Sequence, residues 1–599
     1  MFDSELDGLS TQVRERLAAL GAPPPARIDW APVPFGGTWG FGTAVCFQAA
    51  AAEARAGKAV RVPERAAELA ADLASRLRPP HGFTQLQADK AYLNALVDPG
   101  VFAARVVDRV LATGPEFGRG PQRDERVMVE YAQPNTHHSF HIGHARNALL
   151  GESLARLVEF AGFSTVRASY PGDIGLGVIT CLWGYRRFHA GQEPQGVHAR
   201  GQWLLRVYAE ANALLTAHAG ETAEEAFRRE AYDAERRELY RQWDAGDQEV
   251  RELWHRTRQW SLDELNEILS LLSIPIDVYF FESDADEPAK AIVQELIDRG
   301  LAEDERPAGP VIVRIDEKLG LKKEKFRTAV VLRSDGTTLY LTKDLALAKQ
   351  KFEQFHIDRS IYVVDFRQSL HFQQAFKILE LMGFPQAAKC YHLAYGYVTL
   401  PEGAMSARKG NVVLFMDVLQ EAERRVLNVI AEKNPDLPQE QRAAVARQVG
   451  LGALTYGLLS VDNTKDIVFD MDSALSFDGQ TAPYIQNAHV RASSILRKGG
   501  SLPAAASYGY PLERLELELI DWISRFPTAV QQAATEYKPL HMAAYAYDLA
   551  RAFHAFYHAV PVLQADEPIR SSRLRLVAAA RQTLANALRL LDIAAPDVM

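Results

Sequence analysis

The chain has 599 residues, of which 47% are hydrophobic and 24% are charged, and its formal net charge at pH 7 is −9. This length predicts three to five domains, and the composition is that of a folded protein, which excludes the disordered and fibrous classes. The negative charge offers no electrostatic argument for nucleic-acid binding.

Features of membrane and secreted proteins do not occur in the sequence. No run of eighteen apolar residues occurs, so we expect no membrane span. The segment Met1 to Glu5 lacks a basic stretch followed by an apolar one, so we expect no secretion signal. Cys46, Cys181 and Cys390 are isolated and make neither a disulfide framework nor a zinc knuckle. We therefore expect a cytoplasmic protein.

The first 115 residues are rich in alanine and predict an α/β domain. Helical periodicity runs from Leu6 to Leu20 and from Ala66 to Leu77. A polar stretch, 116–126, with Gly-Arg-Gly-Pro at its centre, predicts a linker to the next domain.

Residues 127–170 predict a strand, a loop, a helix and a second strand, the unit of a parallel nucleotide-binding sheet. Val127 to Tyr131 alternate as in a strand, and Pro134 stops it. Helical periodicity begins at Gly143, and Gly162 stands where a helix C-terminal glycine is expected. Thr165 to Tyr170 predict the second strand.

The loop of this unit carries two histidines at the start of the helix. His141 and His144 flank Ile-Gly, and both can donate hydrogen bonds to phosphate oxygens as negative charge develops there. Gly143 lets a base or ribose lie against the backbone. Two alternatives remain open from these residues alone: a metal site that also uses His137 and His138, or a histidine-rich surface loop.

Further along, three segments matter for a site. Asp173 and Gly175 follow the second strand, where Asp173 could accept a hydrogen bond from a ribose or simply form a turn. Residues 186–275 predict a helical insertion. Residues 329–341 predict a hairpin around Asp335-Gly336, followed by a helix. On these residues alone, Asp344 is expected to cap that helix.

Two motifs in order carry a family resemblance. Residues 129–135, followed by His141-Ile142-Gly143-His144, resemble the first signature of class I aminoacyl-tRNA synthetases, and residues 404–411 resemble the second. More narrowly, nearly the whole chain is similar to arginyl-tRNA synthetases. The resemblance implies a multidomain α/β fold with an N-terminal tRNA-contacting add-on domain (1–115) and a Rossmann-type parallel-sheet catalytic domain (127–400). It also implies a mobile signature loop with a stem-contact region (401–460) and an all-α anticodon-binding bundle (461–599).

The resemblance also assigns roles to residues. A tyrosine and a carboxylate suit a guanidinium, because the acid accepts it bidentately and the ring offers a cation-binding face. The expected arginine-binding residues are Glu130, Asn135, Tyr340, Asp344, Gln368 and His371. The expected ATP-binding residues are His141, His144, Asp173, Gly175, Gly396, Val398, Met405 and Ser406. The expected catalytic residues are His141, Gly143, His144, Arg408 and Lys409.

The second signature departs from the class pattern. Ala404 and Ala407 stand where the class has lysine, so Arg408 or Lys409 is expected to supply the charge, with His138 assisting when protonated. An inactive enzyme is the alternative.

Contacts with tRNA are expected at both ends of the chain. By the resemblance, Phe83 stacks on a base, Gln85 reads a base edge, Tyr484 and Tyr557 stack on anticodon bases, and Met599 touches the anticodon loop. For the aromatic residues, burial in a core is the competing interpretation.

The expected activity is ATP-dependent ligation of L-arginine to tRNA-Arg through an arginyl-adenylate, with release of AMP and pyrophosphate. Mg²⁺ should accompany ATP, and we expect no structural metal and a monomer. The rivals are another nucleotidyl transferase with the same core and a non-catalytic RNA-binding paralogue.

Overall fold

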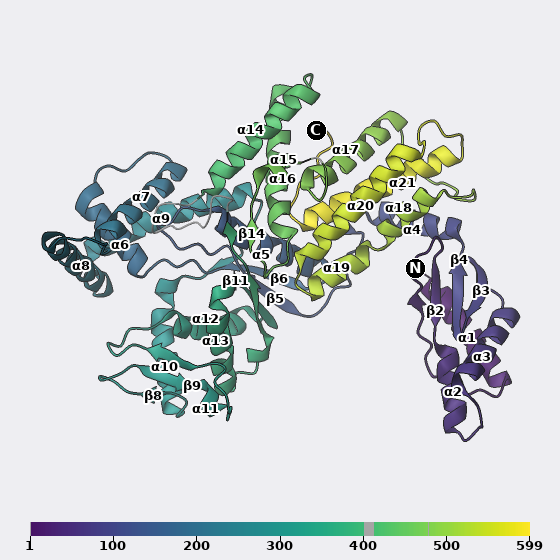
Figure 1. Ribbon diagram of the computed structural model, residues 1–599, viewed down its shortest axis with the longest axis horizontal. Helices are drawn as coiled ribbons and strands as arrows, with labels where there is room; N and C mark the ends of the chain where they lie inside the picture. The colour runs from purple at the N-terminus through teal and green to yellow at the C-terminus, as the bar shows by residue number, and fades with distance from the viewer. Residues whose placement is uncertain (1, 400–412, 477) are drawn as a thin grey trace.

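The computed structural model describes residues 2–399, 413–476 and 478–599. Figure 1 shows the N-terminal domain at one side of the C-terminal helical bundle, and the central sheet with two further subdomains at the other side. Within the described residues, none of the helices combines the length and apolarity needed to cross a bilayer.

The N-terminal domain is a four-stranded antiparallel sheet with the strand order β1-β2-β4-β3 and three helices. Alternating burial along β4 places Leu93, Ala95 and Val97 in its core. The elements are α1 (Asp3–Ala19), β1 (Ala31–Pro32), β2 (Gly40–Thr43), α2 (Val45–Arg55), α3 (Val62–Arg76), β3 (Phe83–Asp89) and β4 (Tyr92–Val97).

The central sheet is fully parallel, with the strand order β12-β11-β5-β6-β7. The predicted strand–helix–strand unit is confirmed as β5, α5 and β6, and Gly162 has a φ of 105° just after α5. Such a sheet presents the carboxyl ends of its strands along one edge. Its elements are β5 (Arg126–Glu130), α5 (Ile142–Phe160), β6 (Ser164–Ser169), β7 (Val278–Tyr279), β11 (Arg359–Asp365) and β12 (Cys390–Tyr395).

A helical subdomain connects β6 to β7, where the sequence predicted a helical insertion. Its core packs Trp183, Trp243 and Trp254 together, and the subdomain projects to one side of the molecule (Figure 1). Its elements are α6 (Leu176–Gly184), the π-helical turn η2 (Tyr185–His189), α7 (Val197–Leu214), α8 (Ala223–Asp244) and α9 (Gln248–Leu271).

A second subdomain connects β7 to β11 and was not expected. It contains a three-stranded antiparallel sheet with the order β10-β9-β8 and its own core. Its elements are η3 (Glu282–Asp284), α10 (Asp286–Asp298), β8 (Glu303–Asp304), β9 (Val311–Arg314), α11 (Ile315–Lys318), β10 (Thr328–Leu332) and α12 (Tyr340–Phe355).

The predicted hairpin at 329–341 is wrong in its second strand. The turn at Gly336 is present, with a φ of 83°, but beyond it only Thr338 makes an isolated bridge to Leu332. Helix α12 begins at Tyr340. A helix forms here because the buried residues, which include Leu341 and Leu345, have helical spacing. Strand β10 pairs with β9 instead of with a second hairpin strand.

The chain then returns through the last strands to an all-helical C-terminal part. Helix α4 (Pro99–Thr113) and the turn η1 (Gly114–Glu116) run from the N-terminal domain and pack against this bundle. The remaining elements are η4 (Phe366–Gln368), α13 (Ser369–Leu381), η5 (Ala387–Lys389), β13 (Val398–Thr399), α14 (Phe415–Lys433), α15 (Gln439–Leu459), β14 (Ile467–Val468), α16 (Met471–Ala474), α17 (Ala482–Gly499), α18 (Arg514–Ser524), α19 (Phe526–Thr535), α20 (Pro539–Ala559) and α21 (Ile569–Leu590).

Candidate active site

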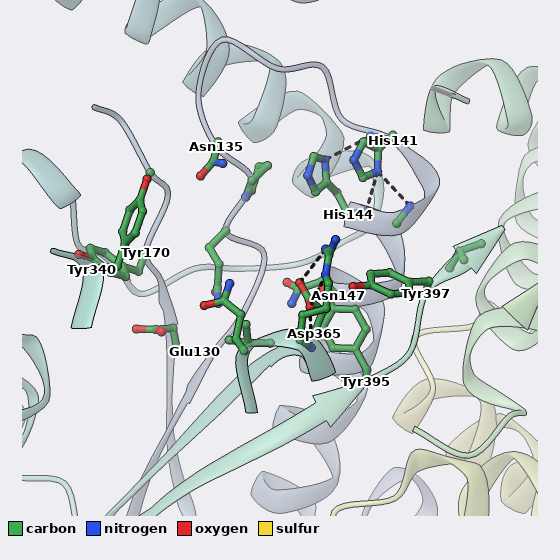
Figure 2. Close-up of a pocket in the computed structure, with 18 of the residues that line it drawn as sticks. Glu130, Asn135, His141, His144, Asn147, Tyr170, Tyr340, Asp365, Tyr395 and Tyr397 are labelled. Atoms are coloured by element: carbon green, nitrogen blue, oxygen red, sulfur yellow. Dashed lines mark hydrogen bonds and ion pairs between the residues drawn. The ribbon is translucent and has the colours of Figure 1, made fainter. Parts of the chain in front are cut away.

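A cavity of about 670 Å³ lies at the carboxyl ends of the parallel strands. Glu130, Asp365 and Tyr395 line it as the last residues of β5, β11 and β12. Figure 2 shows Tyr170 and Tyr340 at one end and His141 and His144 at the other. Ligands of open α/β sheets bind at this edge, and the volume suits a small-molecule substrate.

The two histidines form a reciprocal cap on α5. Nδ1 of His141 accepts hydrogen bonds from the backbone N–H groups of Gly143 (3.1 Å) and His144 (3.2 Å). Nδ1 of His144 accepts from the backbone N–H of His141 (3.4 Å), and the two rings stack with centroids 3.6 Å apart. A Cβ on Gly143 would lie 3.0 Å from the His141 ring, so glycine makes room for this arrangement.

The cap also sets the protonation of the two rings. Burial lowers the pKa of His141 to about 4 and lowers the pKa of His144 well below its ordinary value, so both rings are neutral near pH 7. Because each Nδ1 accepts a hydrogen bond, the proton of each ring is on Nε2. Two N–H donors therefore stand at the positive end of a helix dipole, where an anion is stabilised.

At the other end, three acids line the cavity, and each has a basic partner. Glu130 is paired with Lys351, Lys343 Nζ lies 3.1 Å from Glu282 Oε1, and His371 Nε2 lies 2.5 Å from Asp344 Oδ2. Burial raises the pKa of Glu282 to about 7, against the opposing effect of Lys343. Two of the three acids are thus balanced by lysines, which leaves Asp344 as the acid whose partner is a histidine.

Between the two ends, Asn135 and Gln368 reach the cavity from loops after β5 and β11. Gly172 leaves room for the Asn135 side chain, because a Cβ at Gly172 would lie 2.4 Å from Asn135 Oδ1. Thr136 N donates to Gly172 O at 2.9 Å, which ties the two loops together. A polar group is therefore held midway between the acidic and the histidine ends.

The last part of the wall is backbone, formed by Gly396, Tyr397 and Val398. A Cβ on Gly396 would lie 2.5 Å from the backbone of Lys465, so only glycine allows this approach. The buried side chain of Arg146 donates to four carbonyl oxygens: Gly396 (2.5 Å), Tyr397 (3.1 Å), Asn463 (3.2 Å) and Lys465 (2.8 Å).

Comparison with known proteins decides the family. Residues 106–471 match the family model described as tRNA synthetases class I (R), catalytic domain, and residues 485–599 match the DALR anticodon binding domain. The arginine–tRNA ligase of Bdellovibrio bacteriovorus is 38% identical over 515 residues, which cover 85% of this chain and 86% of that protein. This chain belongs to the class I arginyl-tRNA synthetases.

Other members of the family agree. The arginine–tRNA ligase of Clostridium botulinum strain 657 is 34% identical over 514 residues, covering 86% of this chain and 87% of that one. The solved arginyl-tRNA synthetase of Thermus thermophilus has a TM-score of 0.71 at 27% identity and covers 99% of this chain and 100% of its own. The Plasmodium falciparum structure shares the fold at 16% identity, with a TM-score of 0.72, 100% coverage of this chain and 99% of its own.

Several predicted synthetase residues do line the cavity, and three of the alternatives are excluded. Asp344 lies one turn inside α12 and caps nothing. The four-histidine metal site fails because His137 is fully buried and bonded to Thr136 and Thr257. An exposed histidine-rich surface loop is also excluded by this burial.

The predicted residues that line the cavity are Glu130, Asn135, His141, Gly143, His144, Tyr340, Asp344, Gln368, Gly396 and Val398.

Asp173 and Gly175 are not brought to the cavity wall. Asp173 is fully buried, and its oxygens accept hydrogen bonds from Ser283 N (2.9 Å) and Ser283 Oγ (2.8 Å). Arg258 Nε lies 2.8 Å from Asp173 Oδ2 as an ion-pair partner. Asp173 does not line the cavity, and these partners occupy its carboxylate, so its ribose contact stays a prediction. Gly175 precedes α6 with a φ of 123° and lies near the Tyr340 hydroxyl.

His371 and His138 act differently from expectation. His371 reaches the site through its bond to Asp344 rather than by lining the cavity. His138 packs on Tyr208, and burial lowers its pKa, which opposes the protonated form proposed for it. Ala404, Met405, Ser406, Ala407, Arg408 and Lys409 lie outside the described residues.

The residues expected to contact tRNA differ in how exposed they are. Phe83 is 8% exposed and packs edge-on against Phe2, so stacking on a base is wrong for it and core packing is right. Gln85 is exposed on β3. Tyr484 is half-buried against His554, whereas Tyr557 is 38% exposed with the Arg491 guanidinium over its ring. Met599 packs beside α14, and Asn434 Nδ2 donates to its carbonyl oxygen at 3.3 Å.

Sequence reasoning missed three residues that line the cavity or hold its wall: Glu282, Lys351 and Arg146. Glu282 follows β7, so its place just beyond a parallel strand was a usable signal. Lys351 and Arg146 carry no such signal, because each looks like an ordinary surface-helix residue until its partners, more than 200 residues away, are known.

Proposed function

We propose that this cavity joins L-arginine to ATP and then passes the arginyl group to the terminal adenosine of tRNA-Arg. The observation that carries the proposal is the polarity of the cavity, with acids at one end and a histidine-capped helix N-terminus at the other. An amino acid with a cationic side chain and a triphosphate need these two environments, one at each end.

Arginine lies with its guanidinium toward Asp344, Tyr340 and Glu282, above Glu130. Figure 2 shows Tyr340 and Glu130 at this end. A planar guanidinium suits several acceptors around it, whereas a lysine ammonium does not fill a planar fork. His371 holds Asp344 in place, and Asn135 and Gln368 take the α-amino group midway along the cavity.

Activation is nucleophilic attack by the arginine carboxylate on the α-phosphorus of ATP, which expels pyrophosphate. The Nε2–H groups of His141 and His144 donate to the phosphate oxygens as charge builds up. The backbone of Gly396 and Val398 contacts the adenine. Mg²⁺ enters with ATP as part of the substrate. No side-chain nucleophile is needed, so positioning and charge stabilisation supply the rate.

The remaining roles are assigned to larger parts of the chain. We assign residues 1–115 and 461–599 to tRNA binding, with Gln85, Tyr484, Tyr557 and Met599 as contacts. Arg408 and Lys409 supply positive charge to the pyrophosphate. The protein acts as a monomer in the cytoplasm. Its three unpaired cysteines suit that reducing compartment.

The test is exchange of labelled pyrophosphate into ATP with each of the twenty amino acids, with and without tRNA-Arg. Exchange with arginine alone among the amino acids supports the proposal. A dependence on tRNA would show that tRNA completes the site. Tight tRNA binding without any exchange would overturn it in favour of an RNA-binding protein.

The acid with no lysine partner gives a sharper prediction. Asp344→Asn should raise the arginine KM about ten- to a hundredfold, because one hydrogen bond to a charged group is lost. The ATP KM and the tRNA affinity should change little. Normal arginine kinetics in this variant would remove Asp344 from the pocket.

A further inference from the structure

One of the acids that line the cavity, Glu130, is paired with a buried lysine that does not itself line the cavity. Glu130 ends β5, with its side chain 4% exposed, and its Oε2 accepts a hydrogen bond from Lys351 Nζ. The Lys351 side chain is 0% exposed. Its ammonium lies 4.4 Å from the ring centroid of Tyr362 and 5.5 Å from that of Phe280.

The presence of a fully buried ammonium at this position has to be explained. A buried ion pair is usually no more stable than apolar residues of the same volume, so stability alone does not explain it. The position of Lys351 on α12 points to a role at the site. Tyr340, Asp344 and Lys351 follow one another at intervals of four and seven residues, so they lie on one face of the helix. The helix that carries two residues of the proposed arginine site therefore also places a cation next to Glu130.

The groups around Glu130 define its charge. Lys351 and Asp344 face it from α12, Tyr362 from β11, and Tyr170 from the segment after β6. On β12, Cys390 adjoins Lys351 and Tyr362. Burial raises the pKa of Glu130, the charge of Asp344 raises it further, and Lys351 is the cation that lowers it.

We propose that Lys351 is a positioning residue for arginine recognition: it keeps Glu130 charged and fixes which carboxylate oxygen is offered to the substrate. This deepens the proposed arginine site and rests on it. A protonated Glu130 would lose its negative charge, and one of its two oxygens would become a hydroxyl donor facing a guanidinium that has only donors. The contact would therefore weaken. Lys351 therefore determines selection of arginine without touching it.

The test uses pyrophosphate exchange with tRNA-Arg present, over pH 6 to 9. Lys351→Met should raise the arginine KM about ten- to a hundredfold at the acid end. The rise should shrink toward pH 9, as Glu130 loses its proton. Lys351→Arg, which keeps the charge, should restore most of the affinity. The ATP KM should stay near the wild-type value in both variants.

Two further variants separate this role from folding. Glu130→Gln should raise the arginine KM at every pH, because an amide does not titrate in this range. Adding Lys351→Met to it should cause no further rise, since Lys351 acts through Glu130. This double variant also removes both buried charges, so it tests the proposal even if Lys351→Met alone does not fold.

The contrary results are distinct. An arginine KM that is unchanged or lower in Lys351→Met, or a pH-independent rise, would overturn the proposal. An equal rise in the ATP KM would reduce Lys351 to a structural residue. If the wild-type protein itself shows no arginine-dependent exchange, the proposed function fails and the inference fails with it.

Discussion

At the scale of single residues, His141 combines an observed cap on α5 with the phosphate-donor role that we propose for it. Its Nδ1 caps α5 by accepting from two backbone N–H groups, and its Nε2–H is then free to act as a donor. The cap stabilises the helix, whereas the proposed donor would act only as phosphate charge develops. A substitution that keeps one role and removes the other can therefore separate them.

His141→Asn should make that separation. Asparagine is a good N-cap, so thermal unfolding should change little, whereas His141→Ala should lose about 1 kcal/mol of cap stability. Both variants lack the Nε2 donor, and the exchange rate should fall about a hundred- to a thousandfold in each. A calorimetric scan and the exchange assay test the pair. An active Asn variant would contradict the donor role.

At the scale of elements, α5 is held at its far end by the bundle. Arg156 on α5 lies 2.7 Å from Asp592, which follows α21, and also bonds to the buried Glu152. Tyr131, just after β5, donates to Glu152 at 2.5 Å. Strand, helix and bundle thus meet in one buried polar network.

Asp592 makes the stability of this junction depend on pH. Burial raises its pKa from 3.8 to about 7, so the folded protein binds the proton more tightly than the unfolded chain. This contribution is fully present below pH 3.8 and is lost as pH rises toward 7. Asp592→Asn removes it and tolerates the φ of 58° there.

The variant should therefore become more stable relative to the wild type as pH rises from 5 to 8. The melting temperatures of both proteins across that range test this. Asp7→Asn, at an exposed carboxylate on α1, is the control and should show a constant difference. A constant difference for Asp592→Asn as well would show that its carboxyl titrates normally.

At the scale of the whole molecule, Arg146 joins parts of the chain that are far apart in sequence. It reaches from α5 to the cavity backbone at Gly396 and to residues 463 and 465, beyond which the chain continues into the C-terminal bundle. The same guanidinium therefore fixes the backbone at Gly396 against the segment that leads into the bundle.

Arg146→Lys should raise the ATP KM about tenfold or more, because a lysine ammonium has three donors and cannot reproduce the fork. The arginine KM should change less, since the acidic end of the cavity is not held by this residue. Exchange kinetics with each substrate varied in turn test the prediction. Equal effects on both substrates would indicate a general loss of structure.

Much of the architecture was predictable because it rests on local signals. The β5–α5–β6 unit is encoded by periodicity and the position of Gly162, and the two signatures identify the family. The second strand of the predicted hairpin is wrong because a turn signal at Gly336 does not specify the element after the turn. The helix expected after the hairpin begins already at Tyr340, and β10 pairs with β9 instead.

The sequence by itself determined the family, the parallel sheet and the residue types at the site, since motif order and hydrophobic spacing are written along the chain. Only the tertiary structure decided which polar groups are available to a substrate. Asp173 bonds to Ser283 away from the cavity, Phe83 is buried, and Glu130 is paired with a lysine 221 residues away. Burial and ion pairing depend on distances in space, which no local pattern contains.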